Sequence, residues 1–87
     1  MIRVAITDDN PKILSSLRLL LTCSKEMQLV SETRNGQEAV DCAKRLHPDV
    51  LVMDVHMPVL DGFAAVKKIQ DVAESTCVIL MSLDTDR

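Results

Sequence analysis

The sequence is poor in the residues that mark unusual protein classes. Its 87 residues include one aromatic side chain, Phe63, together with 2 glycines and 3 prolines. So little glycine and proline excludes collagen-like and low-complexity chains, and a hydrophobic fraction of 47% provides the apolar surface for a core. A chain this short buries only about 60% of the surface that it exposes when unfolded, so we expect a single domain of marginal stability.

Cysteine is also scarce. Cys23, Cys42 and Cys77 are odd in number, lack CxxC spacing and lie in segments that contain apolar residues. This pattern argues against a zinc site and a disulfide framework. We therefore expect all three to be reduced thiols in or near the core.

Long apolar runs and basic clusters are both missing. No stretch approaches the roughly 20 apolar residues of a membrane span, and the N-terminus lacks the layout of a signal peptide, so we expect a cytoplasmic location and no membrane contact. The net charge is −3, and basic residues adjoin only in pairs such as Lys44-Arg45 and Lys67-Lys68. We expect no nucleic-acid binding by this segment.

Short apolar runs alternate with helical periodicity along the chain. The predicted strands are Ile2–Thr7, Met27–Thr33, Asp49–Asp54 and Cys77–Ser82. The helical patterns between them consist of Ile13, Leu14, Leu17, Leu20 and Leu21, then Ala39, Val40, Ala43 and Leu46, then Phe63, Val66 and Ile69. Asn10 and Pro11 are typical of a helix start, and Asn35-Gly36 marks the turn into the second helix.

This alternation predicts the α/β class, with a doubly wound parallel sheet and right-handed crossovers. The nearly continuous apolar runs further predict that helices cover both faces of the strands.

Three carboxylates follow two of these strands. Asp8 and Asp9 come after the first strand and Asp54 ends the third, and the carboxyl ends of parallel strands meet at one edge of the sheet. Two like charges 4 Å apart repel by about 4 kcal/mol at an effective dielectric of 20, so we expect raised carboxyl pKa values. The all-oxygen ligand set suits Mg²⁺, and Asp54 can then serve as a nucleophile toward a phosphoryl group.

A plainer interpretation assigns Asp8-Asp9 to turn or helix-cap chemistry. Against it, Asp54 closes a buried strand, Met57-Pro58 forms a turn and Asp61-Gly62 opens the next helix. We expect Asp61 itself to be a helix N-cap rather than a metal ligand.

These residues together closely resemble the receiver domains of two-component response regulators, over the whole length of the chain. The matching motifs are Asp8-Asp9, the stretch from His47 to Asp54, Met57-Pro58, Asp61-Gly62 and Ser82. The resemblance implies a flavodoxin-like fold in which Asp54 is phosphorylated. The segments 35–39 and 80–82 look most like the NarL-type subfamily, whose full-length members usually add a helix-turn-helix domain.

The same resemblance implies a role for each matching residue. Asp9 would bind Mg²⁺ directly, Asp8 largely through water, and the backbone carbonyl of His56 would complete the protein ligands. Ser82 would be the switch hydroxyl that turns toward the phosphoryl group. The His56 side chain itself is expected to be solvated.

The chain departs from the family pattern at its end. The family has five strand–helix units, whereas this sequence stops at Arg87, after about four strands and three helices. We therefore expect residues 1–87 to be a partial receiver domain without an output domain. The family's lysine and aromatic switch residue have no counterpart here, because Lys67 and Lys68 lie on the third helix.

The expected strand order 2-1-3-4-5 would leave the fourth strand as an unpaired edge and the first helix without its neighbour. We expect self-association through strand four or the first-helix face.

The leading functional hypothesis is a signalling switch rather than an enzyme. A sensor histidine kinase or small phosphodonor would phosphorylate Asp54 and so alter a downstream, transcriptional output. This partial domain is not expected to complete that response. One alternative is an aspartyl-phosphate hydrolase, although Asp54-Val55-His56 lacks the second acid of a DxD pair. The other is a self-associating interaction module with an inactive acid site.

Overall fold

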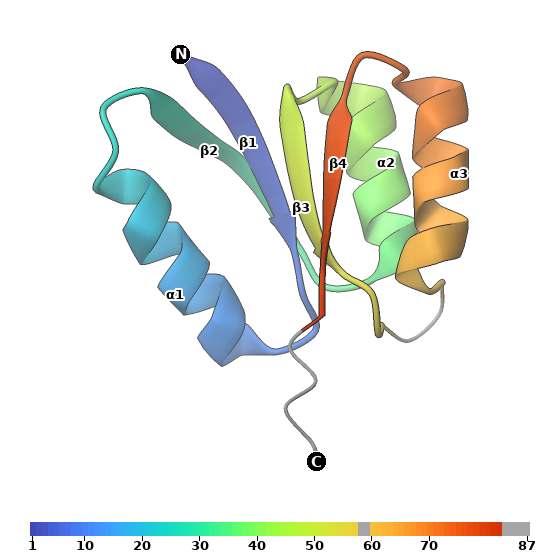
Figure 1. The fold of residues 1–87 in the computed structure, drawn as a ribbon, viewed down its shortest axis with the longest axis horizontal. Coiled ribbons are helices and arrows are strands. Elements are labelled where there is room, and N and C mark those ends of the chain that lie inside the picture. The colour runs from blue at the N-terminus through green and yellow to red at the C-terminus, as the bar shows by residue number, and fades with distance from the viewer. Residues whose placement is uncertain (58–59, 83–87) are drawn as a thin grey trace.

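Four parallel strands form a single sheet in the computed structural model, which describes residues 1–57 and 60–82. The strands are β1 (Ile2–Thr7), β2 (Met27–Thr33), β3 (Val50–Asp54) and β4 (Cys77–Met81), and they lie in the order β2-β1-β3-β4 (Figure 1). Every neighbouring pair is parallel. The order confirms the prediction that β4 lies at an edge.

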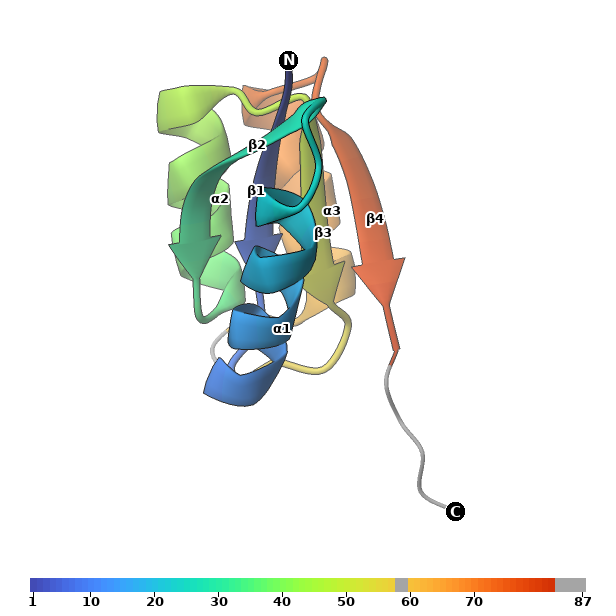
Figure 2. The same ribbon diagram turned by 90° about the vertical axis from the view of Figure 1, so that its left-hand side faces the viewer.

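In the part of the chain that the structure describes, three helices cover the sheet: α1 (Pro11–Thr22), α2 (Gly36–Leu46) and α3 (Gly62–Val72). Figures 1 and 2 show α1 on one face and α2 with α3 on the other, which confirms the doubly wound α/β class. Within the described residues, no helix is both long and apolar enough to cross a membrane.

Each helix begins at a polar cap. The side chains of Asn10, Asn35 and Asp61 accept hydrogen bonds of 2.9 Å from backbone amides of the first turns of α1, α2 and α3. Pro11 occupies the first turn of α1, where its missing backbone N–H would have no helical partner and so costs nothing. The predicted cap roles of Asn10 and Asp61 are confirmed.

The core is divided unevenly between the two faces of the sheet. On the α2 and α3 side, the buried cluster contains Ala5, Ala39, Val40, Cys42, Ala43, Leu51, Met53, Met57, Ala65, Ile69 and Ala73. On the α1 side, the buried cluster among the described residues contains Val4, Ile6 and Leu14. A single helix packed against β1 and β2 therefore covers its face less completely than the helix pair covers the other.

Several predictions of burial are wrong. Leu20 and Phe63 were expected on buried helix faces, but each is 68% exposed. The prediction that both faces of every strand are covered is wrong for β4, where Ile79 is 48% exposed. Periodicity identifies residues that share a helix face, but the burial of that face depends on whether another element packs against it.

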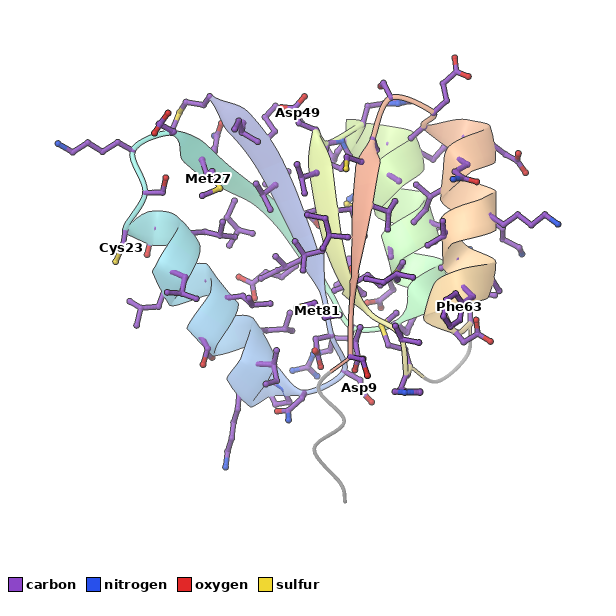
Figure 3. All side chains as sticks on the ribbon, in the orientation of Figure 1. Asp9, Cys23, Met27, Asp49, Phe63 and Met81 are labelled. Carbon is purple, nitrogen blue, oxygen red and sulfur yellow. The ribbon has the colours of Figure 1, made fainter. Side chains whose placement is uncertain are left out.

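The cysteines follow the same division. Cys42 lies in the core of α2 as expected, whereas Cys23 and Cys77 are exposed, so their predicted core placement is wrong. Cys23 follows the last turn of α1, and its thiol projects away from the sheet (Figure 3). Cys77 begins the edge strand β4.

Arg3 joins β1 to the end of α2 and the start of β3. Its guanidinium donates to the carbonyl oxygens of Leu46 (2.9 Å) and His47 (3.1 Å), while its backbone amide donates to Asp49 (2.8 Å). A cation at a helix C-terminus is favourable because the last carbonyls there have no helical partner. This contact anchors the amino end of β3, whose other end carries Asp54.

Candidate functional site

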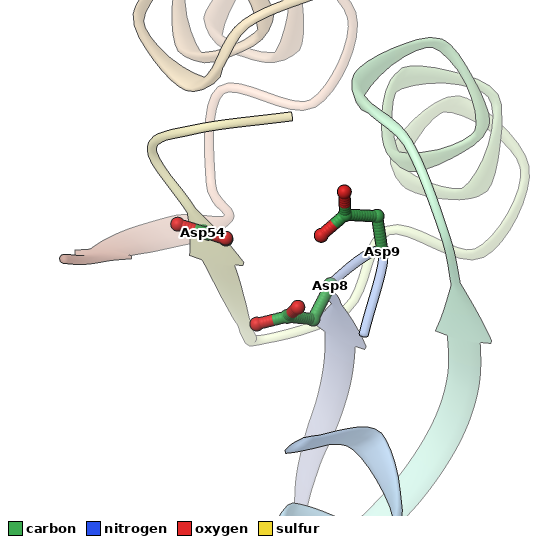
Figure 4. Close-up of side chains that lie close together, drawn as sticks. All are labelled: Asp8, Asp9 and Asp54. Atoms are coloured by element: carbon green, nitrogen blue, oxygen red, sulfur yellow. The ribbon is translucent and has the colours of Figure 1, made fainter. Parts of the chain in front are cut away.

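Three carboxylates meet at the carboxyl edge of the sheet. Asp8 and Asp9 follow β1, and Asp54 ends β3, whose Met53 is in register with Thr7 of β1. One oxygen from each carboxylate can be chosen so that all three lie within 4.8 Å of one another. Figure 4 shows the three side chains side by side at the ends of β1 and β3. The predicted convergence of Asp8, Asp9 and Asp54 is confirmed.

Backbone amides orient two of these carboxylates. The His56 amide donates to Oδ1 of Asp54 at 3.0 Å, and the Asn10 amide donates to Oδ1 of Asp8 at 2.9 Å. Each carboxylate accepts from the residue two positions later, which is the local pattern that aspartate favours in turns. In both cases one oxygen is held and the other remains available.

Burial distinguishes the three carboxylates. Asp8 is 1% exposed, Asp54 is half-buried and Asp9 is exposed. Burial raises the pKa of Asp8 above its usual value, and the nearby charges of Asp54 and Asp9 raise it further, against the opposing effect of the Asn10 amide. The expected raised carboxyl pKa is therefore found at Asp8.

The second oxygen of Asp8 indicates that this site can bind a cation. Oδ2 of Asp8 is buried and has no hydrogen-bond partner among the described residues. Asp8 also contributes to the three carboxylates that approach within 4.8 Å of one another, so a hard divalent ion bound there would stabilise its orphaned oxygen. An all-oxygen donor set favours Mg²⁺ over Zn²⁺. The residues present thus fit Mg²⁺, and Asp8, Asp9 and Asp54 are the side chains that would hold it.

The other predicted residues lie around this cluster. Ser82 is exposed and directly follows Met81, which is in register with Asp54, so it lies at the same edge of the sheet. The His56 side chain is exposed, as expected, and its backbone amide contacts Asp54; the ligand role of its carbonyl stays a prediction. Met57 is buried in the core, and Pro58 lies outside the described residues.

The structure adds a glycine that sequence reasoning treated only as part of a helix start. The amide of Gly62 donates to the carbonyl of Val55 at 3.0 Å, and a Cβ on Gly62 would lie 2.8 Å from the Val55 Cα. The start of α3 therefore rests directly on the backbone next to Asp54. The Asp61-Gly62 pair was the available signal, but only the fold shows which backbone it approaches.

Fold and site together define a flavodoxin-like α/β domain with three carboxylates at one edge of its sheet. The family profile described as "Response regulator receiver domain" matches residues 4–87. The chain belongs to this family.

Relatives with different outputs resemble this chain to a similar degree. A protein-glutamate methylesterase/protein-glutamine glutaminase of Methanosarcina acetivorans is 40% identical over 97% of this chain and 24% of its own length. The transcriptional regulatory protein LnrK of Bacillus subtilis is 37% identical over 99% of this chain and 39% of its own length. The chain thus spans less than half of either relative.

Solved receiver domains have the same fold. The response regulator domain of Thermotoga maritima CheB superposes with a TM-score of 0.91 at 37% identity, covering 100% of this chain and 64% of that one. The receiver domain of the putative response regulator NarL from Mycobacterium tuberculosis gives 0.90 at 29% identity, covering 99% and 68%.

The raised pKa of Asp8 predicts a pH-dependent stability effect. The folded state binds the Asp8 proton more tightly than the unfolded chain does, so this residue lowers stability as pH rises above the unfolded value of about 3.9. At pH 7 without divalent ions, Asp8→Asn should stabilise the fold and raise Tm, by roughly 4–8 °C for each 1 kcal/mol gained. Thermal unfolding in the presence of chelator measures the change.

The gain should vanish near pH 3, where Asp8 is protonated in both states, and Mg²⁺ should stabilise the native chain more than the variant. Asp71→Asn, on the exposed surface of α3, is the control for loss of one carboxylate. A lower Tm for Asp8→Asn than for native protein in chelator at pH 7 would contradict the assignment.

Proposed function

We propose that this chain is a phospho-accepting receiver domain in which Asp54, with Mg²⁺, takes a phosphoryl group and thereby switches a downstream transcriptional output. The observation that carries the proposal is the convergence of Asp8, Asp9 and Asp54 within 4.8 Å, with one oxygen of Asp8 buried and unpartnered. Membership of the receiver family supports the same function.

The chemistry follows from the way in which Asp54 is held. Its Oδ1 accepts a hydrogen bond from the His56 amide, which leaves Oδ2 to form the new bond to phosphorus. As this bond forms, the bond from phosphorus to the donor's nitrogen or oxygen breaks, and the leaving group takes the electron pair. Mg²⁺ bound at Asp8, Asp9 and Asp54 would offset the negative charge shared by these carboxylates and the incoming phosphoryl oxygens.

Ser82 is the proposed switch hydroxyl. Phosphorylation adds negative charge and strong acceptor oxygens at Asp54. Ser82 directly follows Met81, which is in register with Asp54. A hydroxyl at this position can donate to a phosphoryl oxygen by a short movement of the chain after β4. Such a movement is the kind of local change that an output domain can read.

The donor in this proposal is a sensor histidine kinase or a small phosphodonor, in the cytoplasm. A transcriptional output is supported by relatives such as LnrK and by the segment that begins at Asn35-Gly36. In this view the domain takes part in its own phosphoryl transfer without turning over an external substrate, and it contacts neither nucleic acid nor membrane itself.

The hydrolase alternative has less support from the site. The residue two positions after Asp54 is His56, whose side chain is exposed, and it supplies an amide rather than a second acid to the acceptor. The alternative of a vestigial acid site differs from the proposal in one respect, because it predicts no phosphoryl adduct.

Incubation with acetyl phosphate and Mg²⁺ should add a single phosphoryl group to the native chain. We expect the adduct in intact-mass spectra to be lost in Asp54→Asn, because an amide cannot form the acyl phosphate. Chelator should also abolish it.

Asp61→Asn is the matched control, because this aspartate caps α3 and its amide counterpart preserves that role. It should be phosphorylated like the native chain. An adduct that persists in Asp54→Asn would move the acceptor elsewhere, and no adduct on the native chain would favour the interaction-module alternative.

We further propose that two copies of this chain associate. Among the described residues, β4 pairs only with β3, so the outer edge of this uncharged strand offers free backbone groups to another strand. The first-helix face is the other candidate, because Leu19 and Leu20 of α1 are 65% and 68% exposed. A second copy supplies the same edge and the same face, as a twofold symmetric contact requires.

Two lysine substitutions distinguish these surfaces. If β4 is the contact, Ile79→Lys should shift sedimentation velocity profiles toward monomer, because edge-strand lysines prevent strand pairing. If the α1 face is the contact, Leu20→Lys should have this effect instead. A native chain that stays monomeric over a wide concentration range would contradict self-association.

A further inference from the structure

Two helices begin with glycines that lie against neighbouring backbone. Gly36 starts α2, and a Cβ on it would lie 2.0 Å from the carbonyl oxygen of Leu60. Gly62 starts α3, and a Cβ on it would lie 2.8 Å from the Val55 Cα and 3.0 Å from the Asp54 carbonyl oxygen. Real side chains do not approach backbone atoms this closely, so both contacts require glycine.

The two contacts form one path between α2 and Asp54. The carbonyl of Leu60 is bonded to Asp61, and Gly62 follows directly. The amide of Gly62 donates to Val55 at 3.0 Å, and the amide of Val55 donates to β4 at Met81. Because these contacts involve backbone atoms, a displacement at Leu60 cannot be absorbed by rotating a side chain.

We propose that Gly36 is a positioning residue for Asp54. The first turn of α2 rests on Leu60, which keeps Gly62 seated on the backbone at Asp54 and Val55. Gly36 therefore acts without touching the cation or the phosphoryl group, through the placement of the acceptor carboxylate beside Asp8. The inference rests on the proposed function for the chemistry at Asp54.

A purely structural role for Gly36 makes a different prediction. A methyl group there would then lower stability but leave the remaining folded molecules with native cation binding. Gln37→Gly is the matched control, because Gln37 is exposed and is the next residue of the same helix turn. A glycine at this position costs less than about 1 kcal/mol in helix propensity. This variant destabilises α2 without adding an atom at the Leu60 contact.

The test compares Gly36→Ala, Gln37→Gly and the native 87-residue chain. Mg²⁺ affinity is measured by NMR titration, and the His56 amide resonance is recorded without metal, since that amide donates to Asp54. We expect Gly36→Ala to bind Mg²⁺ about tenfold more weakly, as happens when the supports of metal ligands are disturbed, and to move the His56 resonance. Gln37→Gly should change neither.

Native affinity and an unmoved His56 resonance in folded Gly36→Ala would overturn the proposal. If that variant does not fold, Leu60→Gly tests the same path, because it frees the backbone on the other side of the contact. It should also weaken Mg²⁺ binding, and native affinity would overturn the proposal in this case as well.

The acetyl phosphate reaction separates this inference from the proposed function. If the native chain forms no adduct while Gly36→Ala still loses Mg²⁺ affinity, the phospho-acceptor function fails and the positioning role stands. If the native chain forms the adduct and Gly36→Ala binds Mg²⁺ normally, the positioning role fails.

Discussion

The parallel pairing of β1 with β3 is the constraint on which the site depends. Because both strands run in the same direction, the residues that follow β1 and the residue that ends β3 lie at one edge of the sheet. Asp8, Asp9 and Asp54 are thus held together by backbone hydrogen bonds despite their mutual repulsion. The fold thus holds negative charges close together at a cost in stability, and a divalent ion would relieve their repulsion.

The two faces of the sheet have different consequences for this site. The larger cluster under α2 and α3 includes Leu51 and Met53 of β3, so the strand that carries Asp54 is well anchored. The face under α1 is thinner and leaves Leu20 and Ile79 exposed. The acceptor is consequently placed by the better-packed half of the molecule, while the exposed half offers surface for association.

Much of the fold could be predicted because strand ends coincide with changes in residue chemistry. The predicted bounds Ile2–Thr7 and Met27–Thr33 match β1 and β2, while β3 starts one residue later and β4 ends one residue earlier than predicted. The convergence of the three aspartates followed from the same parallel order. The predictions for Leu20, Phe63, Cys23 and Cys77 failed because local patterns do not show which elements pack over a given face.

Details inside the site required the three-dimensional structure. Asp8 and Asp9 are neighbours of the same type, yet only Asp8 is buried with an unpartnered oxygen. The approach of Gly36 to Leu60 joins segments that are distant in sequence, so no local motif could indicate it. Sequence thus located the acidic residues, whereas packing determined how each one is held.

The measurement that tests the central claim most directly is chemical mapping of the phosphorylated residue. Borohydride reduces an aspartyl phosphate to homoserine, and peptide mass spectrometry then locates the modified position after treatment with acetyl phosphate and Mg²⁺. If the carboxylates act as proposed, homoserine appears at Asp54 and at neither Asp8 nor Asp9. Homoserine at Asp8 or Asp9, with Asp54 intact, would contradict the account.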